Sequence, residues 1–245
     1  MTKTLLITGG SRGIGATTAI AFAKEGYDVA VNYASNAQKA EAVVEQVLEL
    51  GRRAIAIKGD VSNYEEAKNI VKETFDAFGR IDVLINNAAI KRDGSIDTLS
   101  EEDFDRVMAI NVKGIYTMVK HTINTIPENH PLRIINISSG TGIIGKADQV
   151  NYAASKFAVN GMSVSLGKEL GPRGITVNAV APGLTETDMT DYVTEERKEQ
   201  QRNTIPLKRL GSTQDIADAC VFLASDKASF INGQIIPVNG GIHTA

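Results

Sequence analysis

Short runs of apolar, often β-branched residues alternate along the chain with longer stretches in which apolar residues recur at helical spacing. The runs that we expect to be strands are 3–8, 28–33, 53–60, 82–88, 133–138, 175–181 and 234–240. The stretches that we expect to be helices lie near 13–25, 36–50, 63–78, 101–126, 150–171 and 213–225. Alternating strands and helices indicate a parallel sheet with helices on both faces. Most of the runs are almost continuously apolar, as in strands buried on both sides. The sequence therefore predicts a doubly wound α/β fold of about seven strands.

Several helix ends can be predicted from single residues. Ser62 with Glu65, and Ser100 with Asp103, fit a capping box at a helix start. Glycines 26, 51 and 79 stand where helices are expected to end, in the position that favours a left-handed residue.

No linker, repeat or low-complexity tract divides the 245 residues, so we expect a single domain spanning residues 1–245. One connection departs from the pattern. Residues 184–211 are polar, charged and long for a segment between a strand and a helix. We expect this segment to be a lid over the strand ends that shapes a substrate pocket.

Composition and charge narrow the function. Hydrophobic residues make up 42% of the chain, charged residues 22%, and the net charge is −3, which does not favour binding to nucleic acid or an anionic membrane. No run approaches the ~20 apolar residues of a membrane span, and the N-terminus does not resemble a secretory signal. Cys220 is the single cysteine and lies in an apolar stretch, so we expect a buried thiol. The three histidines show no metal-ligand spacing, and a cytoplasmic location without a metal is expected.

The first expected strand runs directly into "TGGSRGIG" (8–15) and then a helix. Gly9 allows a sharp turn at the strand end, while Gly13 and Gly15 allow the helix start to approach a pyrophosphate and pack on the sheet. Backbone N–H groups and the helix dipole would then face the anion. A glycine turn without a ligand is the alternative, and the position of three glycines at this junction makes it the weaker one.

The second expected strand indicates which dinucleotide binds. An NAD site usually carries an acidic residue about 20 residues after the glycine loop, for the ribose 2′-OH. Here Asn32 occupies that place, and Ser11 and Arg12 could contact a 2′-phosphate, for which the donor fork of arginine is well suited. We therefore expect NADPH; the alternative is a surface Arg12 and a site that tolerates NADH.

Two later strand ends add candidate cofactor contacts. Asp60, in "GDVS", could accept a hydrogen bond from the adenine amino group, with Val61 packed nearby, or could serve as a charge at a helix start. Asn87, in "NNAA" (86–89), should border the cofactor where small side chains allow close approach.

Tyr152 and Lys156, in "NYAASK", are four residues apart and would share a helix face. A nearby positive charge favours the phenolate and would lower the pKa of the tyrosine from its usual value near ~10, which suits proton exchange. Ser139 ends the fifth expected strand and could donate to a substrate carbonyl, with Ser138 as the competing candidate, because only one of two neighbours on a strand can face the pocket. Asn111 stands in mid-helix, where asparagine is mildly unfavourable, and so indicates a specific partner or role.

Together, "TGGSRGIG", "NNAA", Asn111, Ser139, "YAASK" and "PGLTET" (182–187) resemble the short-chain dehydrogenase/reductase family over essentially the whole chain. The resemblance implies a Rossmann-type sheet, with Tyr152 as the acid/base and Lys156 binding the nicotinamide ribose and lowering the pKa of the tyrosine. It also implies that Ser139 orients the carbonyl and that Asn111 holds a water in a proton relay. Further cofactor contacts implied by it are Ile14, Pro182, Gly183, Thr185 and Thr187.

Within that family, "VNYAS", "IKRDG", "RGITVNAVAPG", "IPLKRLG" and "VNGG" are most similar to 3-oxoacyl-[acyl-carrier-protein] reductases. The resemblance implies an NADPH-dependent reduction of a 3-oxoacyl thioester, carried on acyl-carrier protein or CoA, by a homotetramer. Two stretches depart from it: "NNAA" ends in Ala89 in place of the usual glycine, and "PENHP" (127–131) lacks the basic residues that suit an acidic carrier, although Arg173 is present. A reductase of a sugar, steroid or other small ketone or alcohol is the alternative. A third alternative is a nucleotide-binding protein that senses redox state without turnover. Such a protein would lack one or more of the four catalytic residues, and Asn111, Ser139, Tyr152 and Lys156 are all present.

Overall fold

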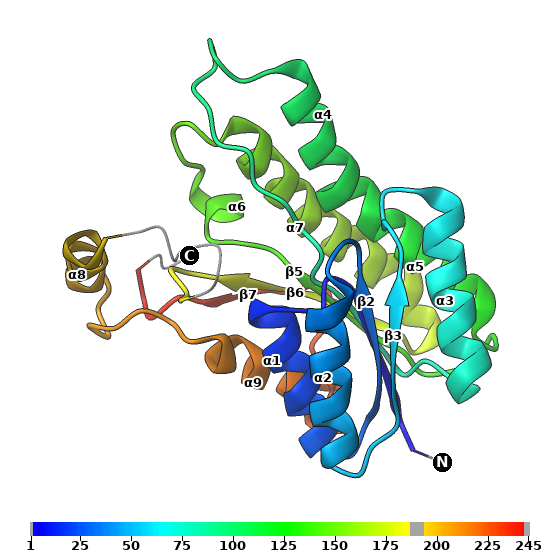
Figure 1. The fold of residues 1–245 in the computed structure, drawn as a ribbon. Coiled ribbons are helices and arrows are strands. Elements are labelled where there is room, and N and C mark those ends of the chain that lie inside the picture. The colour runs from blue at the N-terminus through cyan, green and yellow to red at the C-terminus, as the bar shows by residue number, and fades with distance from the viewer. Residues whose placement is uncertain (1, 187–193, 243–245) are drawn as a thin grey trace.

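The computed structural model describes residues 2–186 and 194–242, and in them one parallel sheet runs through the molecule (Figure 1). Its order is β3-β2-β1-β4-β5-β6-β7. The strands are β1 (Thr4–Ile7), β2 (Asp28–Tyr33), β3 (Ala54–Lys58), β4 (Val83–Asn86), β5 (Arg133–Ile137), β6 (Thr176–Pro182) and β7 (Ile235–Val238). Every expected strand is confirmed, and each lies within or next to its predicted range.

Helices cover both faces of this sheet (Figure 1). One face carries α1 (Gly13–Lys24), α2 (Ala37–Glu49) and α9 (Thr213–Ala224); the other carries α3 (Tyr64–Phe78), α5 (Gly114–Thr125) and α7 (Val150–Leu170). Alternation along β1 builds the two cores, because Leu5 and Ile7 enter the first and Leu6 enters the second. The predicted doubly wound α/β fold is confirmed.

The predicted helix 101–126 is interrupted. It consists of α4 (Glu101–Met108), a π-helical turn (Ala109–Lys113) and α5. Such a turn widens the helix by one residue, and its location at Asn111 fits the frequent use of π-turns at functional sites.

Not all predicted caps are correct. Ser100 does cap α4 by accepting from the backbone N–H of Asp103. The capping box at Ser62 is wrong, because Ser62 donates its N–H and hydroxyl to Asp60 and leaves the cap of α3 to Asn63. Glycines 26, 51 and 79 all have a positive φ at helix ends, as predicted.

Two short helices were not predicted. α6 (Thr141–Ile144) is too short to show a periodic pattern, and α8 (Glu195–Thr204) reads "EERKEQQRNT", with no apolar side chain to mark a buried face. α8 lies inside the segment 184–211, so this part of the predicted lid is helical.

Cys220 is fully buried on α9, and burial raises the pKa of its thiol to about 12, which confirms the predicted core thiol. Among the described residues, His, Cys, Asp and Glu form no group that could hold a metal ion. In the same part of the chain, no helix is both long and apolar enough to cross a bilayer.

Candidate active site

A cavity of about 890 Å³ opens at the carboxyl ends of the strands. Residues that follow β1, β2, β4, β5 and β6 line it, and β1 and β4 are the neighbours between which the strand order reverses. In open α/β sheets, ligands bind in the crevice at this point.

The structure brings most of the predicted site residues to this one cavity. Those that line it are Gly9, Ser11, Arg12, Gly13, Ile14, Asn32, Asp60, Val61, Asn87, Ser139, Tyr152, Lys156, Pro182, Gly183 and Thr185. Gly15 and Asn111 lie behind the lining, and Thr187 lies outside the described residues.

The glycine loop turns tightly between β1 and α1. Gly9 has a φ of +61°, and its amide lies within reach of the Asn32 side chain. A Cβ atom on Gly15 would lie 2.4 Å from the carbonyl oxygen of Gly9, so only glycine allows this approach of helix to loop. α1 begins without a side-chain cap and without an acidic residue in its first turn. Its first N–H groups are therefore directed at whatever anion enters the cavity.

Asn32 is buried and braces this loop from β2. Its side-chain nitrogen donates to the carbonyl oxygens of Ile57 and Gly59, at 3.2 and 3.0 Å. These bonds occupy both donors of the amide. The predicted contact between Asn32 and the cofactor remains a prediction. Tyr33, Ala34, Ser35 and Asn36 continue the cavity wall beyond it.

Asp60 is held in place by its neighbours. Its carboxylate accepts from the N–H and hydroxyl of Ser62 and pairs with Arg106 at 2.7 Å. These partners keep its pKa below the usual value, although burial acts in the opposite direction and is the largest single effect. Asp60 is the one carboxylate among the described residues of the lining, and it is already paired with Arg106.

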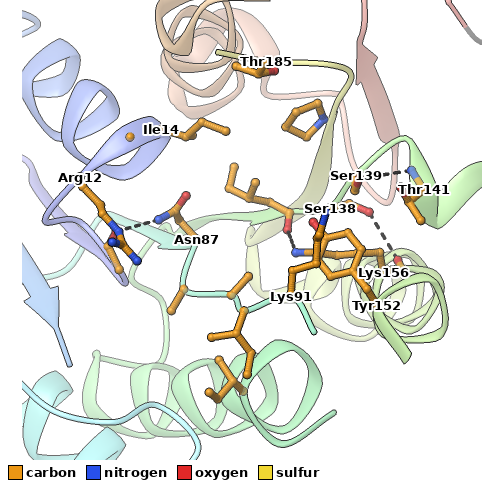
Figure 2. Close-up of a pocket in the computed structure, with 18 of the residues that line it drawn as sticks. Arg12, Ile14, Asn87, Lys91, Ser138, Ser139, Thr141, Tyr152, Lys156 and Thr185 are labelled. Carbon is orange, nitrogen blue, oxygen red and sulfur yellow. Dashed lines mark hydrogen bonds between the residues drawn. The ribbon is translucent and has the colours of Figure 1, made fainter. Parts of the chain in front are cut away.

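At the other end of the cavity, Ser139, Tyr152 and Lys156 lie together (Figure 2). Ser139 shares a hydrogen bond with Tyr152, while Ser138 is buried and directs its hydroxyl at the backbone oxygen of Lys156. The structure thus separates the two serines and places Ser139 against the phenol. The Nζ atom of Lys156 donates to the carbonyl oxygen of Ile137 at 2.7 Å and lies 5.6 Å from the centroid of the Tyr152 ring.

Burial is the largest effect on the pKa of both Tyr152 and Lys156. It raises the pKa of Tyr152, and the opposing effects are the hydrogen bond from Ser139 and the charge of Lys91. The expectation of a Tyr152 pKa below its usual value is therefore not met in the free protein. Burial also lowers the pKa of Lys156 to about 8. Tyr152 is thus protonated at neutral pH, the state required of a proton donor.

Asn111 connects three segments behind the cavity. Its side-chain oxygen accepts from the N–H of Ile90, and its nitrogen donates to the Ile90 carbonyl and the Ser155 hydroxyl. Ser155 in turn donates to the backbone oxygen of Tyr152 at 2.7 Å. Asn111 therefore fixes the loop after β4 against the turn of α7 that carries the phenol, while its role in a water relay remains a prediction.

Some lining residues were not predicted. The substrate end is apolar, with side chains from segments far apart in the sequence: Ile90, Ile144, Leu184, Leu210 and Ile242. Of these side chains, Ile144 is 57% exposed. Lys91 and Gln149 also line this end. A single sequence offers little to identify them, because none stands in a motif with its own spacing rule.

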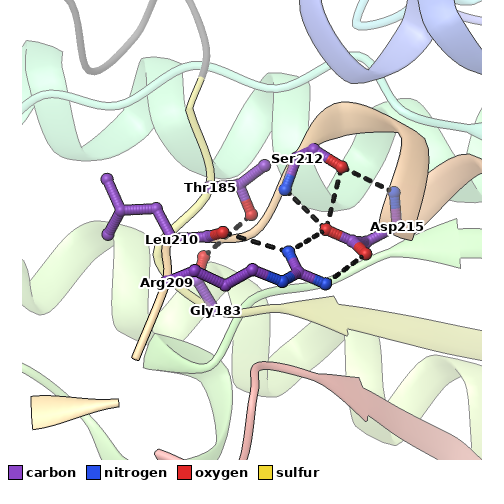
Figure 3. A network of polar contacts seen from close by, with 6 residues as sticks. All are labelled: Gly183, Thr185, Arg209, Leu210, Ser212 and Asp215. Carbon is purple, nitrogen blue, oxygen red and sulfur yellow. Dashed lines mark hydrogen bonds and ion pairs between the residues drawn. The ribbon is translucent and has the colours of Figure 1, made fainter. Parts of the chain in front are cut away.

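The two described ends of the segment 184–211 are joined at the cavity rim (Figure 3). The N–H of Gly211 donates to the carbonyl oxygen of Leu184, and Arg209 forms a two-pronged ion pair with Asp215 at 2.7 and 2.8 Å. Asp215 also completes a full capping box with Ser212 at the start of α9. Between these ends, Lys198 and Gln201 of α8 line the cavity.

A glycine loop facing the start of α1, with a tyrosine, a serine and a buried lysine at the far end of the same cavity, is typical of nicotinamide-dependent oxidoreductases. Comparison with known proteins agrees. A family model described as "Enoyl-(Acyl carrier protein) reductase" matches residues 9–243. The 3-oxoacyl-[acyl-carrier-protein] reductase of Staphylococcus aureus is 46% identical over 243 residues, 99% of each chain. That of Synechocystis is 42% identical over 238 residues, which cover 97% of this chain and 95% of the relative.

Solved structures give the same result. A short-chain dehydrogenase of Burkholderia cenocepacia in complex with NADP superimposes with a TM-score of 0.92 at 38% identity, covering 99% of this chain and 98% of that one. A blue fluorescent protein from a metagenomic library, in complex with NADPH, also gives 0.92, at 36% identity and the same coverage. The chain belongs to the short-chain dehydrogenase/reductase family.

Proposed function

We propose that this protein uses NADPH to reduce a 3-oxoacyl thioester, carried on acyl-carrier protein or CoA, to the 3-hydroxyacyl product. Relatives named 3-oxoacyl-[acyl-carrier-protein] reductase match it over nearly their whole length. The observation that carries the proposal is the placement of Tyr152, with its Ser139 hydrogen bond, between the glycine loop and an apolar chamber in one cavity.

The residues present fit NADPH. Gly9, Gly15 and the uncapped start of α1 form a cradle for a pyrophosphate. Arg12 and Ser35 stand at the cavity wall where a 2′-phosphate needs donors, and the only carboxylate of the described lining, Asp60, is paired with Arg106. No unpaired carboxylate in the described lining would repel the phosphate, which favours NADPH over NADH. Asn87, Pro182, Gly183 and Thr185 line the wall toward the nicotinamide end, where Lys156 would bind the ribose.

NADPH, when bound, supplies the hydride. Ser139 and Tyr152 donate hydrogen bonds to the oxygen of the 3-oxo group and stabilise the negative charge that develops there. Tyr152 then releases its proton to that oxygen. Lys156 holds a positive charge behind the phenol and stabilises the tyrosinate that is left. The apolar side chains at the other end exclude water and receive the acyl chain.

Two other classes of substrate are alternatives to the 3-oxoacyl thioester. The family model that matches the chain is described by enoyl reduction, in which the hydride adds to a carbon–carbon double bond. A small free ketone or secondary alcohol would use the same tyrosine without needing the thioester. Both alternatives keep the cofactor and differ in the group that is reduced.

The test is NADPH oxidation with acetoacetyl-CoA, crotonyl-CoA and ethyl acetoacetate in parallel, with NADH as the control cofactor. We expect fast oxidation with acetoacetyl-CoA and NADPH, and at least about tenfold slower oxidation with each of the other combinations, a difference of ~1.4 kcal/mol in transition-state binding. Turnover of crotonyl-CoA alone would replace the proposal with enoyl reduction. Turnover of the free ester alone would replace it with a small-ketone reductase.

We infer a single domain, residues 1–245, with a substrate lid at 184–211, acting in the cytoplasm. We also infer a homotetramer, because Phe104, Tyr116, Val150 and Phe157 are large side chains left exposed along α4, α5 and α7. Sedimentation velocity measures the mass that this predicts.

A further inference from the structure

We propose that Lys91 is a positioning residue that holds a positive charge beside Tyr152 and sets the pH range in which the tyrosine exchanges its proton. This inference rests on the proposed function of Tyr152 as the acid/base. Neither the family motifs nor the comparisons assign a role to Lys91.

Lys91 reaches the proton-transfer end of the cavity. It follows β4 on the loop that begins with "NNAAIK", and it lines the cavity together with Tyr152. Figure 2 shows its side chain extending into the cavity alongside the tyrosine ring. The side chain is only 26% exposed, and its Nζ atom lies 2.9 Å from a carboxylate oxygen of Asp93. The charge is therefore held within the cavity and is shielded from solvent more than a surface lysine would be.

Hydrogen bonds fix the loop that carries this ion pair. Gln149, which is buried, donates from its side chain to Asp93 at 3.0 Å. The side chain of Asn151 donates to the carbonyl oxygen of Arg92 at 2.8 Å. Because Gln149 and Asn151 flank the start of α7, the loop and Tyr152 are held to the same piece of backbone. Lys91 thus has a fixed position relative to the phenol.

The charges that surround Tyr152 come from three directions. Lys91 and Asp93 face it from the loop after β4, and Lys156 lies beneath the ring on α7. The loop after β5 contributes the hydroxyl of Ser139, and Lys198 of α8 lines the same cavity. The charge of Lys91 lowers the pKa of Tyr152, whereas the charge of Asp93 raises it. The two members of the ion pair therefore act on the tyrosine with opposite sign.

This arrangement matters differently for the two directions of the reaction. Reduction needs the protonated phenol, and oxidation of the 3-hydroxyacyl product needs tyrosinate. By opposing the effect of burial, Lys91 extends tyrosinate formation to lower pH. Its removal should therefore move the titration of Tyr152, and with it the pH limb of the oxidation rate, to higher pH.

Four variants of the full-length protein test this. Lys91→Met removes the charge at similar length, and Lys91→Arg keeps it. Asp93→Asn removes the opposing charge. Lys72→Met, at an exposed position on α3 that pairs with Asp76 outside the cavity, controls for a change in net charge.

The first readout is the pH profile of kcat in both directions, with acetoacetyl-CoA and with 3-hydroxybutyryl-CoA. The second is the near-ultraviolet absorbance of tyrosinate as pH rises, taken as the difference from a Tyr152→Phe protein carrying the same second substitution. The second readout needs no turnover, so it separates a failure of this proposal from a failure of the proposed reaction.

We expect Lys91→Met to move the oxidation limb and the tyrosinate titration to higher pH. Asp93→Asn should move both to lower pH, while Lys91→Arg and Lys72→Met should match the parent. An unchanged titration in Lys91→Met would overturn the proposal. So would a rise in KM with an unchanged pH profile, which would make Lys91 a substrate contact. Shifts of the same sign in Lys91→Met and Asp93→Asn would contradict it as well.

Discussion

At the scale of single residues, the site holds two ionisable side chains under opposite demands. Lys156 must carry a positive charge in a buried place, and burial lowers its pKa to about 8. Tyr152 must give up a proton where burial favours keeping it. The protein thus gives up some stability at this site in return for proton transfer, a common conflict between stability and activity.

The loss of stability caused by burying the charge of Lys156 can be measured through its pH dependence. The folded-state pKa of about 8 lies below the ordinary value of 10.5, so the penalty for burying the charge is fully present below pH 8 and is relieved as pH rises toward 10.5. At 1.36 kcal/mol per unit, the penalty is roughly 3 kcal/mol. We predict that Lys156→Met abolishes turnover and is at least as stable as the parent at neutral pH. Its stability advantage should shrink by roughly 3 kcal/mol between pH 8 and 10.5.

Urea unfolding of the cofactor-free proteins at neutral and alkaline pH measures this difference, with Lys72→Met as an exposed-lysine control. A gap between Lys156→Met and the parent that does not change with pH would contradict a buried, charged Lys156.

At the scale of elements, the connection between β6 and α9 shapes the substrate end. Its two ends meet at the rim, where Arg209 and the Ser212–Asp215 capping box fix the turn into α9 (Figure 3). Arg202 of α8 contacts Glu186 across the segment at 3.8 Å. Ion pairs and a helix cap therefore help to order the rim.

We predict that Asp215→Asn costs about 1 kcal/mol of stability, through the lost ion pair and a weaker cap, and raises KM for the thioester severalfold while NADPH affinity is kept. Ser100→Ala is the control for a weakened helix cap, because Ser100 caps α4 by accepting from the N–H of Asp103, at a position away from the cavity rim. It should cost a similar free energy in urea unfolding and leave KM unchanged. Equal KM values in the two variants would show that the rim does not position the substrate.

Most of the secondary-structure elements could be predicted from the sequence, and the exceptions have physical causes. The seven strands and the main helices could be predicted, because apolar spacing reflects burial on both sides of the sheet directly. α8 could not, because its ten residues include no apolar side chain. The cap of α3 lies at Asn63 and not at Ser62, because Asp60 accepts from both the N–H and the hydroxyl of the serine, a local contact that the capping-box pattern does not include.

Prediction of the candidate site from the sequence is limited in the same way. Residues in motifs with fixed spacing, such as Gly9, Tyr152 and Lys156, were predicted and line one cavity. Strand alternation left Ser138 and Ser139 as alternatives, and only the fold shows that Ser139 meets the phenol. Lys91 and the apolar chamber come from loops whose approach depends on tertiary packing. The balance of burial and charge on Tyr152 likewise could not be derived from an i,i+4 spacing.

At the scale of the whole molecule, the doubly wound sheet brings the candidate site residues together at the carboxyl ends of its strands. The glycine loop comes from β1, Asn87 and Lys91 from β4, Ser139 from β5 and the rim from β6, and all face one cavity. Helices on both faces bury the strands, so the site rests on a rigid support while loops determine its shape.

The most direct test of the account is to measure NADPH binding and acetoacetyl-CoA reduction by Tyr152→Phe. Removing one hydroxyl takes away the proton donor and leaves the ring, the glycine loop and Lys156 in place. We predict a loss of turnover of at least about 100-fold, with the Kd for NADPH within about twofold of the parent, a difference under ~0.5 kcal/mol. Turnover that survives the substitution, with or without a change in NADPH affinity, would contradict the assignment of Tyr152 as the proton donor.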